Sequence, residues 1–432
     1  MLNSYNAEKN KFISKLETIL EKRRKKNSTK SRLVKKIIKD IKKYGDKALL
    51  RYEKKFSYLK QIKIKEIKFS KQEIKKIISK LDKRTKKDID LAFLRVFKFH
   101  KKQKFKSYKV TDNYKNSLSY KSSPIERIGI YVPGGKASYP STVIMNCVPA
   151  IIAGVKDIFM ATPIIDKKYN AAVIYAATKC KVKEIYKMGG AQAIASFAYG
   201  TNTIPKVNKI VGPGNDFVYL AKKEVYGDVG IDMLAGPSEV TIVADKSCKP
   251  EWVAADLIAQ AEHDNFAQSI LISNNKKIIS KVNFYLKKQL INLPKKNIAF
   301  RSLKKFGLSI YVKNIKKLVT IINTIAPEHL EICTNKPQKI LKQIKNAGSI
   351  FVGNYSPEAM GDYLAGTNHV LPTSGSAKFS SGLSVNDFIK RHSLIKITKS
   401  GIERLGSSVI NLAMHENLEG HANSIKIRMK KD

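Results

Sequence analysis

The feature that most constrains the fold is a pattern that recurs through the middle of the chain. Short β-rich runs are each closed by a Gly/Pro turn and followed by a stretch with helical spacing, and these runs are Arg127–Val132, Asp157–Ala161, Glu184–Met188 and Lys209–Val211. A parallel strand cannot be reached by a hairpin and needs a crossover connection, usually a helix. Strand, turn and helix in alternation therefore predict an α/β fold with a parallel sheet.

A second stretch of the same kind follows. It holds expected strands at Glu239–Ala244 and Ser269–Ser273 around a helix at Trp252–Asp264, with further strands at Leu308–Val312 and Ser349–Val352. No G-x-G-x-x-G fingerprint is present. Glycine turns before helix N-termini suit a pyrophosphate, but they serve equally well as tight connections. We predict two Rossmann-like parallel-sheet domains, both incomplete and lacking the fingerprint.

The two ends of the chain differ from its middle in composition and in hydrophobic periodicity. Roughly the first hundred residues are Lys-rich with apolar residues at helical spacing, as in Ser31–Ile41 and Ile74–Leu81. After about residue 380 the sequence becomes helical and mixed. We therefore expect small helical parts at the N- and C-terminal ends.

The charge balance raises an alternative function. The 82 Lys and Arg residues against 35 Asp and Glu give a formal net charge of +47, which suggests a polyanion such as nucleic acid as partner. The lysines, however, are spread along helical surfaces among many Ile and Asn residues, a pattern we attribute to A·T-rich coding. No nucleic-acid-binding motif accompanies them. We expect no nucleic-acid partner.

Length and cysteine usage narrow the class further. A chain of 432 residues exceeds one ordinary core, so we expect more than one domain. No apolar run reaches the roughly 18 residues of a membrane-spanning helix, and the N-terminus lacks a signal-peptide pattern, which favours a cytoplasmic protein without a membrane partner. The four cysteines form no C-x-x-C pair, so we expect reduced thiols packed as small hydrophobic groups: Cys147, Cys180, Cys248 and Cys333.

Histidines gather beside carboxylates and glycines in the second half of the chain. Six of the seven lie after residue 260. In the stretch Asp256–Asp264, helical spacing places Gln260 and His263 on one face, which suits a pair of ligands. A helix end with His263 satisfied by a neighbouring carboxylate fits the same residues.

The run Ala326–Glu331 looks like the start of a helix. Proline at a first helical position costs no hydrogen bond, and an acid there complements the helix dipole. These effects account for Pro327 and Glu328 but leave His329 unexplained. Two adjacent titratable groups make a plausible acid/base pair.

Two further clusters remain. The stretch Gly353–His369 is a long glycine-rich loop, and such loops tend to be functional. Within it, Asp362 suits either an Asx turn or a hard-oxygen metal ligand. The stretch His415–His421 is explained equally well as a solvated helix end. Imidazole and carboxylate with an open position suit catalytic zinc, so residue types alone suggest a site from His263, His421 and a carboxylate.

Several longer strings, taken in order, resemble the histidinol dehydrogenase family, and the similarity runs from about Arg127 to the C-terminus. The strings are Tyr131-Val-Pro-Gly-Gly, Gly189-Gly-Ala-Gln-Ala-Ile-Ala, Gly212-Pro-Gly-Asn, Ile231-Asp-Met-Leu-Ala-Gly-Pro-Ser-Glu, Gln260-Ala-Glu-His-Asp, Ala326-Pro-Glu-His-Leu and Gly361-Asp-Tyr. The first hundred residues share only helical character with the family, and the large positive charge departs from it.

The resemblance implies a set of site residues. It implies one zinc ion per subunit, held by Gln260, His263, Asp362 and His421; the residues alone favour Glu262 or Asp264 over Gln260, because an amide oxygen is the weaker ligand. It implies Glu328 and His329 as the catalytic pair. The implied substrate contacts are Ser238, Gln260, His263, His329, Asp362, Glu416 and His421, with His369 nearby. The implied NAD contacts are Tyr131, Gln192 and Asn215.

The resemblance also implies the activity and the assembly. The expected reaction is oxidation of L-histidinol by two NAD, through a bound aldehyde, to L-histidine, catalysed by a homodimer with a shared active site. The expected domains are an N-terminal helical arm (1–24), a discontinuous main α/β domain carrying the zinc and catalytic residues (25–107 and 237–378), an inserted NAD-binding α/β domain (108–236), and a small C-terminal domain (379–432) that completes the site across the dimer.

Overall fold

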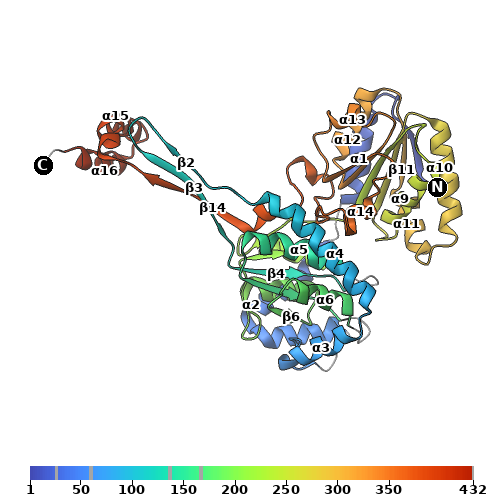
Figure 1. Ribbon diagram of the computed structural model, residues 1–432, viewed down its shortest axis with the longest axis horizontal. Coiled ribbons are helices and arrows are strands. Elements are labelled where there is room, and N and C mark those ends of the chain that lie inside the picture. The colour runs from blue at the N-terminus through green and yellow to red at the C-terminus, as the bar shows by residue number, and fades with distance from the viewer. Residues whose placement is uncertain (25–27, 58–61, 135–138, 165–168, 431–432) are drawn as a thin grey trace.

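The computed structural model shows two α/β units and a projecting arm (Figure 1). It describes residues 1–24, 28–57, 62–134, 139–164 and 169–430. Both main sheets are parallel, and the third is a small antiparallel sheet in the arm. The expected α/β class is therefore confirmed.

The first unit is built on a six-stranded parallel sheet. Its strand order is β1 (Asn3–Asn6), β11 (Leu308–Tyr311), β10 (Gln268–Ser273), β9 (Glu239–Ala244), β12 (His329–Cys333) and β13 (Ser349–Val352). One face packs on α9 (Pro250–Ala261), α10 (Lys276–Leu290) and α11 (Lys296–Phe306). The other packs on α1 (Phe12–Arg24), α12 (Ile315–Ile325) and α13 (Gln338–Leu341). Strands β9 and β10, which are covered on both faces, are buried throughout.

The second unit is built on a five-stranded parallel sheet. Its order is β6 (Glu184–Tyr186), β5 (Asp157–Ala161), β4 (Arg127–Tyr131), β7 (Lys209–Val211) and β8 (Gly230–Ile231). One face packs on α3 (Lys71–Ser79), α4 (Lys83–His100), α5 (Pro140–Ala153) and α6 (Ala171–Lys179). The other packs on α2 (Ser28–Phe56), α7 (Gly190–Tyr199) and α8 (Asp216–Val225). In chain order this sheet reads 3-2-1-4-5, which places a topological switch point between β4 and β7.

The arm combines two distant parts of the chain. Strands β2 (Tyr108–Thr111) and β3 (Ser117–Pro124) pair antiparallel with each other, and β3 also pairs with β14 (Ile389–Lys396). Helices α15 (Lys399–His415) and α16 (Glu419–Met429) pack together at its far end. Figure 1 shows this arm extending away from both main sheets.

The contacts of the terminal regions differ from the expected domain assignment in three respects. Residues 25–107 were expected with the six-stranded unit, but α2 packs on α7 and α8, and α3 and α4 pack on α5 and α6, all in the five-stranded unit. The first 24 residues contain β1 as well as a helix, and residues 108–124 and 389–396 form the arm's strands. Helical periodicity shows that a helix has an apolar face, but it does not show which sheet that face will cover.

Most predicted strands match the structure, and one element was predicted wrongly. Strands β5, β7, β9 and β13 have the predicted bounds, and β4, β6, β10 and β11 differ by one or two residues. The predicted helix start at Pro327–Glu328 is wrong, because His329 begins β12. All five residues of β12 are buried between β9 and β13, so tertiary pairing outweighs the local helix signals.

The remaining sequence expectations concern cysteines and membrane spans. All four cysteines are free and buried, as expected. Among the described residues, no helix has the length and apolar character to cross a membrane. Gly135, in the first family-like string, lies outside the described residues.

Candidate active site

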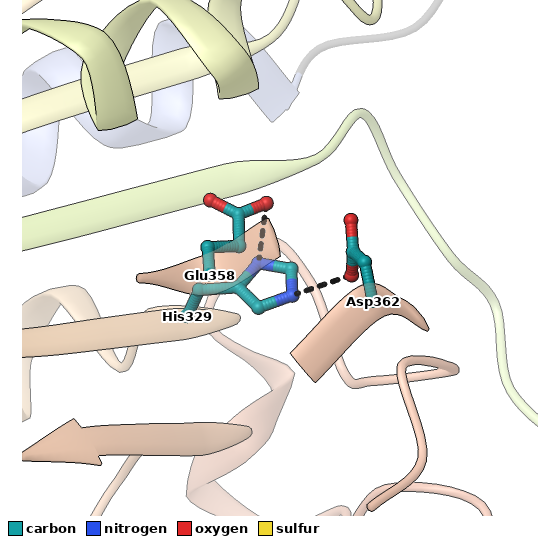
Figure 2. A group of neighbouring side chains, drawn as sticks. All are labelled: His329, Glu358 and Asp362. Carbon is teal, nitrogen blue, oxygen red and sulfur yellow. Dashed lines mark ion pairs between the residues drawn. The ribbon is translucent and has the colours of Figure 1, made fainter. Parts of the chain in front are cut away.

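A cluster of buried polar residues lies at the amino ends of the central strands of the six-stranded sheet. Glu239 begins β9, His329 begins β12, and Glu358 and Asp362 lie on α14 (Glu358–Tyr363). Figure 2 shows the His329 ring between these last two carboxylates. Its Nδ1 lies 3.6 Å from Glu358 Oε1, and its Nε2 lies 3.9 Å from Asp362 Oδ1.

The hydrogen bonds of His329 define its protonation. Nδ1 lies 3.0 Å from the backbone oxygen of Glu239. A carbonyl oxygen can only accept, so Nδ1 carries the proton in the neutral ring. Nε2 is buried and has no hydrogen-bond partner among the residues that the structure describes. Burial lowers the pKa of His329 to about 4, and nearby Asp362 partly opposes that shift. The neutral ring therefore presents an unprotonated nitrogen to the site.

Glu328, the residue before His329, is held by the same backbone unit. Its Oε2 accepts a hydrogen bond of 2.8 Å from the backbone N–H of Glu239. The side chain is buried, and burial raises the pKa of Glu328 well above its ordinary value. The backbone of Glu239 thus fixes both neighbours, through its N–H and its carbonyl.

The cluster has the donor set of a metal site. One ligand atom from each of His329, Glu358 and Asp362 lies within 4.8 Å of the others. Gln260, at the end of α9, donates through Nε2 to Glu358 Oε1 (2.9 Å) and to the Glu239 carbonyl (3.1 Å). With both N–H groups so engaged, its amide oxygen stays available as a ligand. One imidazole nitrogen, one amide oxygen and two carboxylates at one point suit a divalent transition metal.

A second polar site lies at the carboxyl edge of the five-stranded sheet. The Tyr131 hydroxyl, at the end of β4, accepts from Gly190 N at 3.1 Å. The Asn215 side chain caps α8 after β7 by accepting from the N–H groups of Phe217 and Val218. These two residues flank the switch point, where open α/β sheets bind their ligands.

Comparisons with known proteins identify the family. The sequence profile of the family described as histidinol dehydrogenase matches residues 20–429. The chain belongs to the histidinol dehydrogenase family. It is 54% identical to the histidinol dehydrogenase of Pelagibacter ubique over the full length of both chains, and 46% identical to that of Clostridium acetobutylicum over 96% of each. A crystal structure of histidinol dehydrogenase from Elizabethkingia anophelis shares 37% identity, covers 99% of this chain and 98% of its own, and superposes with a TM-score of 0.92. Membership of this family makes the chain an oxidoreductase.

The structure brings most of the residues implied by the family resemblance into one place. Gln260, His329 and Asp362 lie together, and the charge of His263 acts on the pKa of both His329 and His369. The Nδ1 of His369 lies 3.0 Å from the Asp362 carbonyl. Ser238 directly precedes Glu239, and its backbone oxygen accepts from Arg23 at 3.2 Å.

Two of the family-implied residues lie elsewhere in this chain. Glu416 caps the end of α15 and His421 lies on α16, both exposed at the far end of the arm. Figure 1 shows these helices well apart from α14 and β12. The described part of one chain therefore assembles the site without Glu416 and His421.

Three residues that shape the site had no role assigned from the sequence. Glu358 lies in the long glycine-rich stretch from which only Asp362 was chosen. Glu239 ends one of the family-like strings, but it acts through its backbone, and residue type does not indicate such a role. Buried Arg23 of α1 forms an ion pair with the Glu239 carboxylate and donates to the Pro237 carbonyl at 2.7 Å. Arg23 is followed by Arg24 in a helix that also carries two lysines, so its residue type gives no sequence signal of this role.

The sequence also gave no reason to connect Glu53 with the second site. This buried side chain of α2 accepts from Gln192 Nε2 at 2.8 Å and from Gly189 N at 2.9 Å. Burial raises the pKa of Glu53 to about 7. Tyr131 lies nearby, and burial raises the pKa of Tyr131 to about 12, with the charge of Glu53 adding to the shift. The carboxyl group of Glu53 thus holds both Gln192 and the glycine turn before α7.

Proposed function

We propose that this chain oxidises L-histidinol to L-histidine in two NAD-linked steps through a bound aldehyde. The observation that carries the proposal is the unprotonated, unpartnered Nε2 of His329, beside Glu328 and a metal-suited donor set. The relatives named above are histidinol dehydrogenases, and this is why we propose L-histidinol as the substrate.

The two oxidations need different proton acceptors. In the alcohol step the substrate hydroxyl loses a proton and its carbon loses a hydride, which NAD accepts. His329 Nε2 takes that proton, because Nδ1 is already committed to the Glu239 carbonyl. In the aldehyde step a water molecule adds to the carbonyl carbon and gives its proton to Glu328, and the hydrated carbon then loses its hydride to the second NAD. Burial raises the pKa of Glu328, which makes its carboxylate a stronger base.

We assign the metal site to Gln260, His263 and Asp362 of one chain and to His421 of the partner subunit. A zinc ion there would hold and orient the substrate's imidazole and amine. The free amide oxygen of Gln260 and the carboxylate of Asp362 fit this assignment. Glu358 completes the surroundings by orienting the amide of Gln260.

We assign the NAD site to the carboxyl edge of the five-stranded sheet, with Tyr131, Gln192 and Asn215 as contacts. The N-termini of α7 and α8 lie at this edge, and the positive ends of their dipoles suit a pyrophosphate. NAD held at this edge would receive the hydride, although the sequence has no G-x-G-x-x-G turn.

We further propose that two copies of the chain form a cytoplasmic homodimer and share their active sites. The arm helices expose apolar side chains that a partner would cover: Leu405, Val409, Leu412, Met414, Leu418 and Ile427. Clustered apolar exposure of this kind marks an interaction surface. The same segment carries Glu416 and His421, so covering it would deliver both residues to a second site. The proposal includes no nucleic-acid partner.

A stoichiometric assay tests the function. Purified protein is given limiting L-histidinol with excess NAD, and NADH is followed by absorbance. Two NADH per L-histidinol, with L-histidine as the product, is the expected result. A single NADH per substrate, or no turnover with zinc supplied, would refute the two-step proposal.

A further inference from the structure

Helix α5 contains a proline where a helix normally has a hydrogen-bond donor. Pro149 lies inside this buried helix, and proline has no backbone N–H. The carbonyl four residues earlier, that of Met145, therefore lacks its helical partner. Asn368 Nδ2, from a segment more than two hundred residues away, donates to this carbonyl at 2.7 Å. The proline has made a backbone acceptor available in the middle of a buried helix.

Asn368 uses both ends of its amide. Its Oδ1 accepts from Val370 N at 2.9 Å, while Nδ2 serves Met145. The side chain is 8% exposed, and Val370 belongs to the same apolar core as α5. A buried amide with both groups satisfied holds its segment in one position.

The segment that Asn368 fastens carries two residues of the candidate active site. Asp362 lies six positions before it and His369 directly after it, and His369 Nδ1 lies 3.0 Å from the Asp362 carbonyl. Arg95 of α4 adds a hydrogen bond to the carbonyl of Leu364. The chain after Asp362 is thus attached to helices of the five-stranded unit, whereas His329 belongs to the six-stranded unit.

We propose that Pro149 and Asn368 form a positioning pair, in which the proline frees the Met145 carbonyl and the asparagine docks on it. Docking sets the positions of Asp362 and His369 relative to His329. Helix α5 of the five-stranded unit thereby helps to fix the geometry of the candidate active site. Neither residue touches the reacting groups. The kinetic consequences rest on the proposed function, but the docking itself does not.

The kinetic test combines two substitutions. Asn368→Ala removes the donor and should lower kcat/KM for L-histidinol roughly tenfold, as loss of a residue that orients metal ligands does. Pro149→Ala restores an N–H that competes with Asn368 for the Met145 carbonyl. It should lower kcat/KM by up to roughly tenfold. The double variant should be no worse than Asn368→Ala, because both changes remove one interaction.

Thermal stability separates this role from a merely structural one. Asn368→Ala should lower the Tm, whereas Pro149→Ala should keep or raise it, because alanine restores a helical hydrogen bond. A loss of activity without a loss of stability is not expected of a residue that only supports the fold. Asn208→Ala is the matched control, since Asn208 joins two segments of the five-stranded unit by accepting from Arg127 N at 3.1 Å. Its kcat/KM should equal that of the wild type.

Hydrogen exchange tests the docking without reference to activity. Amides of residues 362–370 should exchange faster in both single variants than in the wild type and in Asn208→Ala. Unchanged exchange in both variants would overturn the positioning pair even if the enzyme is active. Strictly additive losses in the double variant would also overturn it. If the wild type does not oxidise L-histidinol, the proposed function fails while the exchange result still decides the docking.

Discussion

At the scale of single residues, one backbone unit organises the chemistry. The N–H of Glu239 holds Glu328, and its carbonyl fixes the proton of His329 on Nδ1. One peptide unit therefore holds two adjacent side chains, to which we assign different tasks. The sequence indicated the pair, but the residue that holds both of them is visible only in the structure.

The division of labour predicts a selective defect. Glu328→Gln should slow oxidation of the aldehyde by roughly a hundredfold or more while largely sparing the alcohol step, because only the aldehyde step needs an activated water. Single-turnover measurements starting from L-histidinol and from the aldehyde would separate the two steps. His329→Asn should impair both. Equal losses in the two half-reactions of Glu328→Gln would contradict the assignment.

The proposed metal ligands predict a second outcome. His263→Asn should lower zinc content and activity together, and added zinc should restore part of the activity, since one of four ligands is lost. Elemental analysis with activity assays at graded zinc concentrations measures both. His392→Asn is the control, because His392 is exposed on β14 in the arm. Full activity of His263→Asn without detectable zinc would exclude the metal site.

At the scale of elements, α2 contributes a buried acid, Glu53, beside the glycine turn before α7. Burial raises the pKa of Glu53 from 4.5 to about 7, so the folded protein binds the proton more tightly than the unfolded chain does. The stability linked to this proton is fully present below pH 4.5 and is lost as pH rises through about 7.

Removing the titration should remove the pH dependence. Relative to wild type, Glu53→Gln should gain stability as pH rises from 4.5 to 8, by up to about 3 kcal/mol, because glutamine keeps the acceptor without the charge. Urea unfolding at several pH values measures the free energy of unfolding. Exposed Glu66→Gln provides the control. Parallel pH profiles of wild type and Glu53→Gln would show that Glu53 is not the group responsible.

Predictability from sequence differed between elements for a physical reason. Strands such as β5 and β9 were predictable because their apolar runs are short and closed by turns, which leaves little room for a helix. Strand β12 was mistaken for a helix start because Pro327 and Glu328 carry local helix signals, whereas pairing with β9 and β13 decides the outcome.

At the scale of the whole molecule, the arm predicts assembly across a dimer. Glu328→Gln chains and His421→Ala chains, both defective in forming L-histidine, are mixed after mild dissociation, and formation of L-histidine is measured. If the arm serves the partner's site, each mixed dimer regains one intact site, and random pairing should restore about a quarter of wild-type activity per site. No recovery, with mixed dimers shown to have formed, would rule out a shared site.

Although the chain is strongly basic, the burial of the proposed catalytic groups predicts little effect of salt on catalysis. At ~1 M salt the Debye length falls to about 3 Å, which would strip a phosphate-bound partner but barely affect buried groups such as His329 and Glu328. Turnover should therefore stay close to its low-salt value once any change in KM for NAD is allowed for. A requirement for added nucleic acid would support the alternative of a polyanion partner.

The sequence by itself determined the fold class, most strands, and the residue types of the site, because periodicity and turn chemistry are local and family strings preserve site residues. It could not show that α2 to α4 belong to the five-stranded unit, since the apolar face of a helix does not indicate which partner it will cover. Nor could it show that Glu239, Glu358, Arg23 and Asn368 shape the site, because they act through backbone groups and partners far apart in the chain. Only the tertiary structure decided those contacts, by bringing the distant segments together.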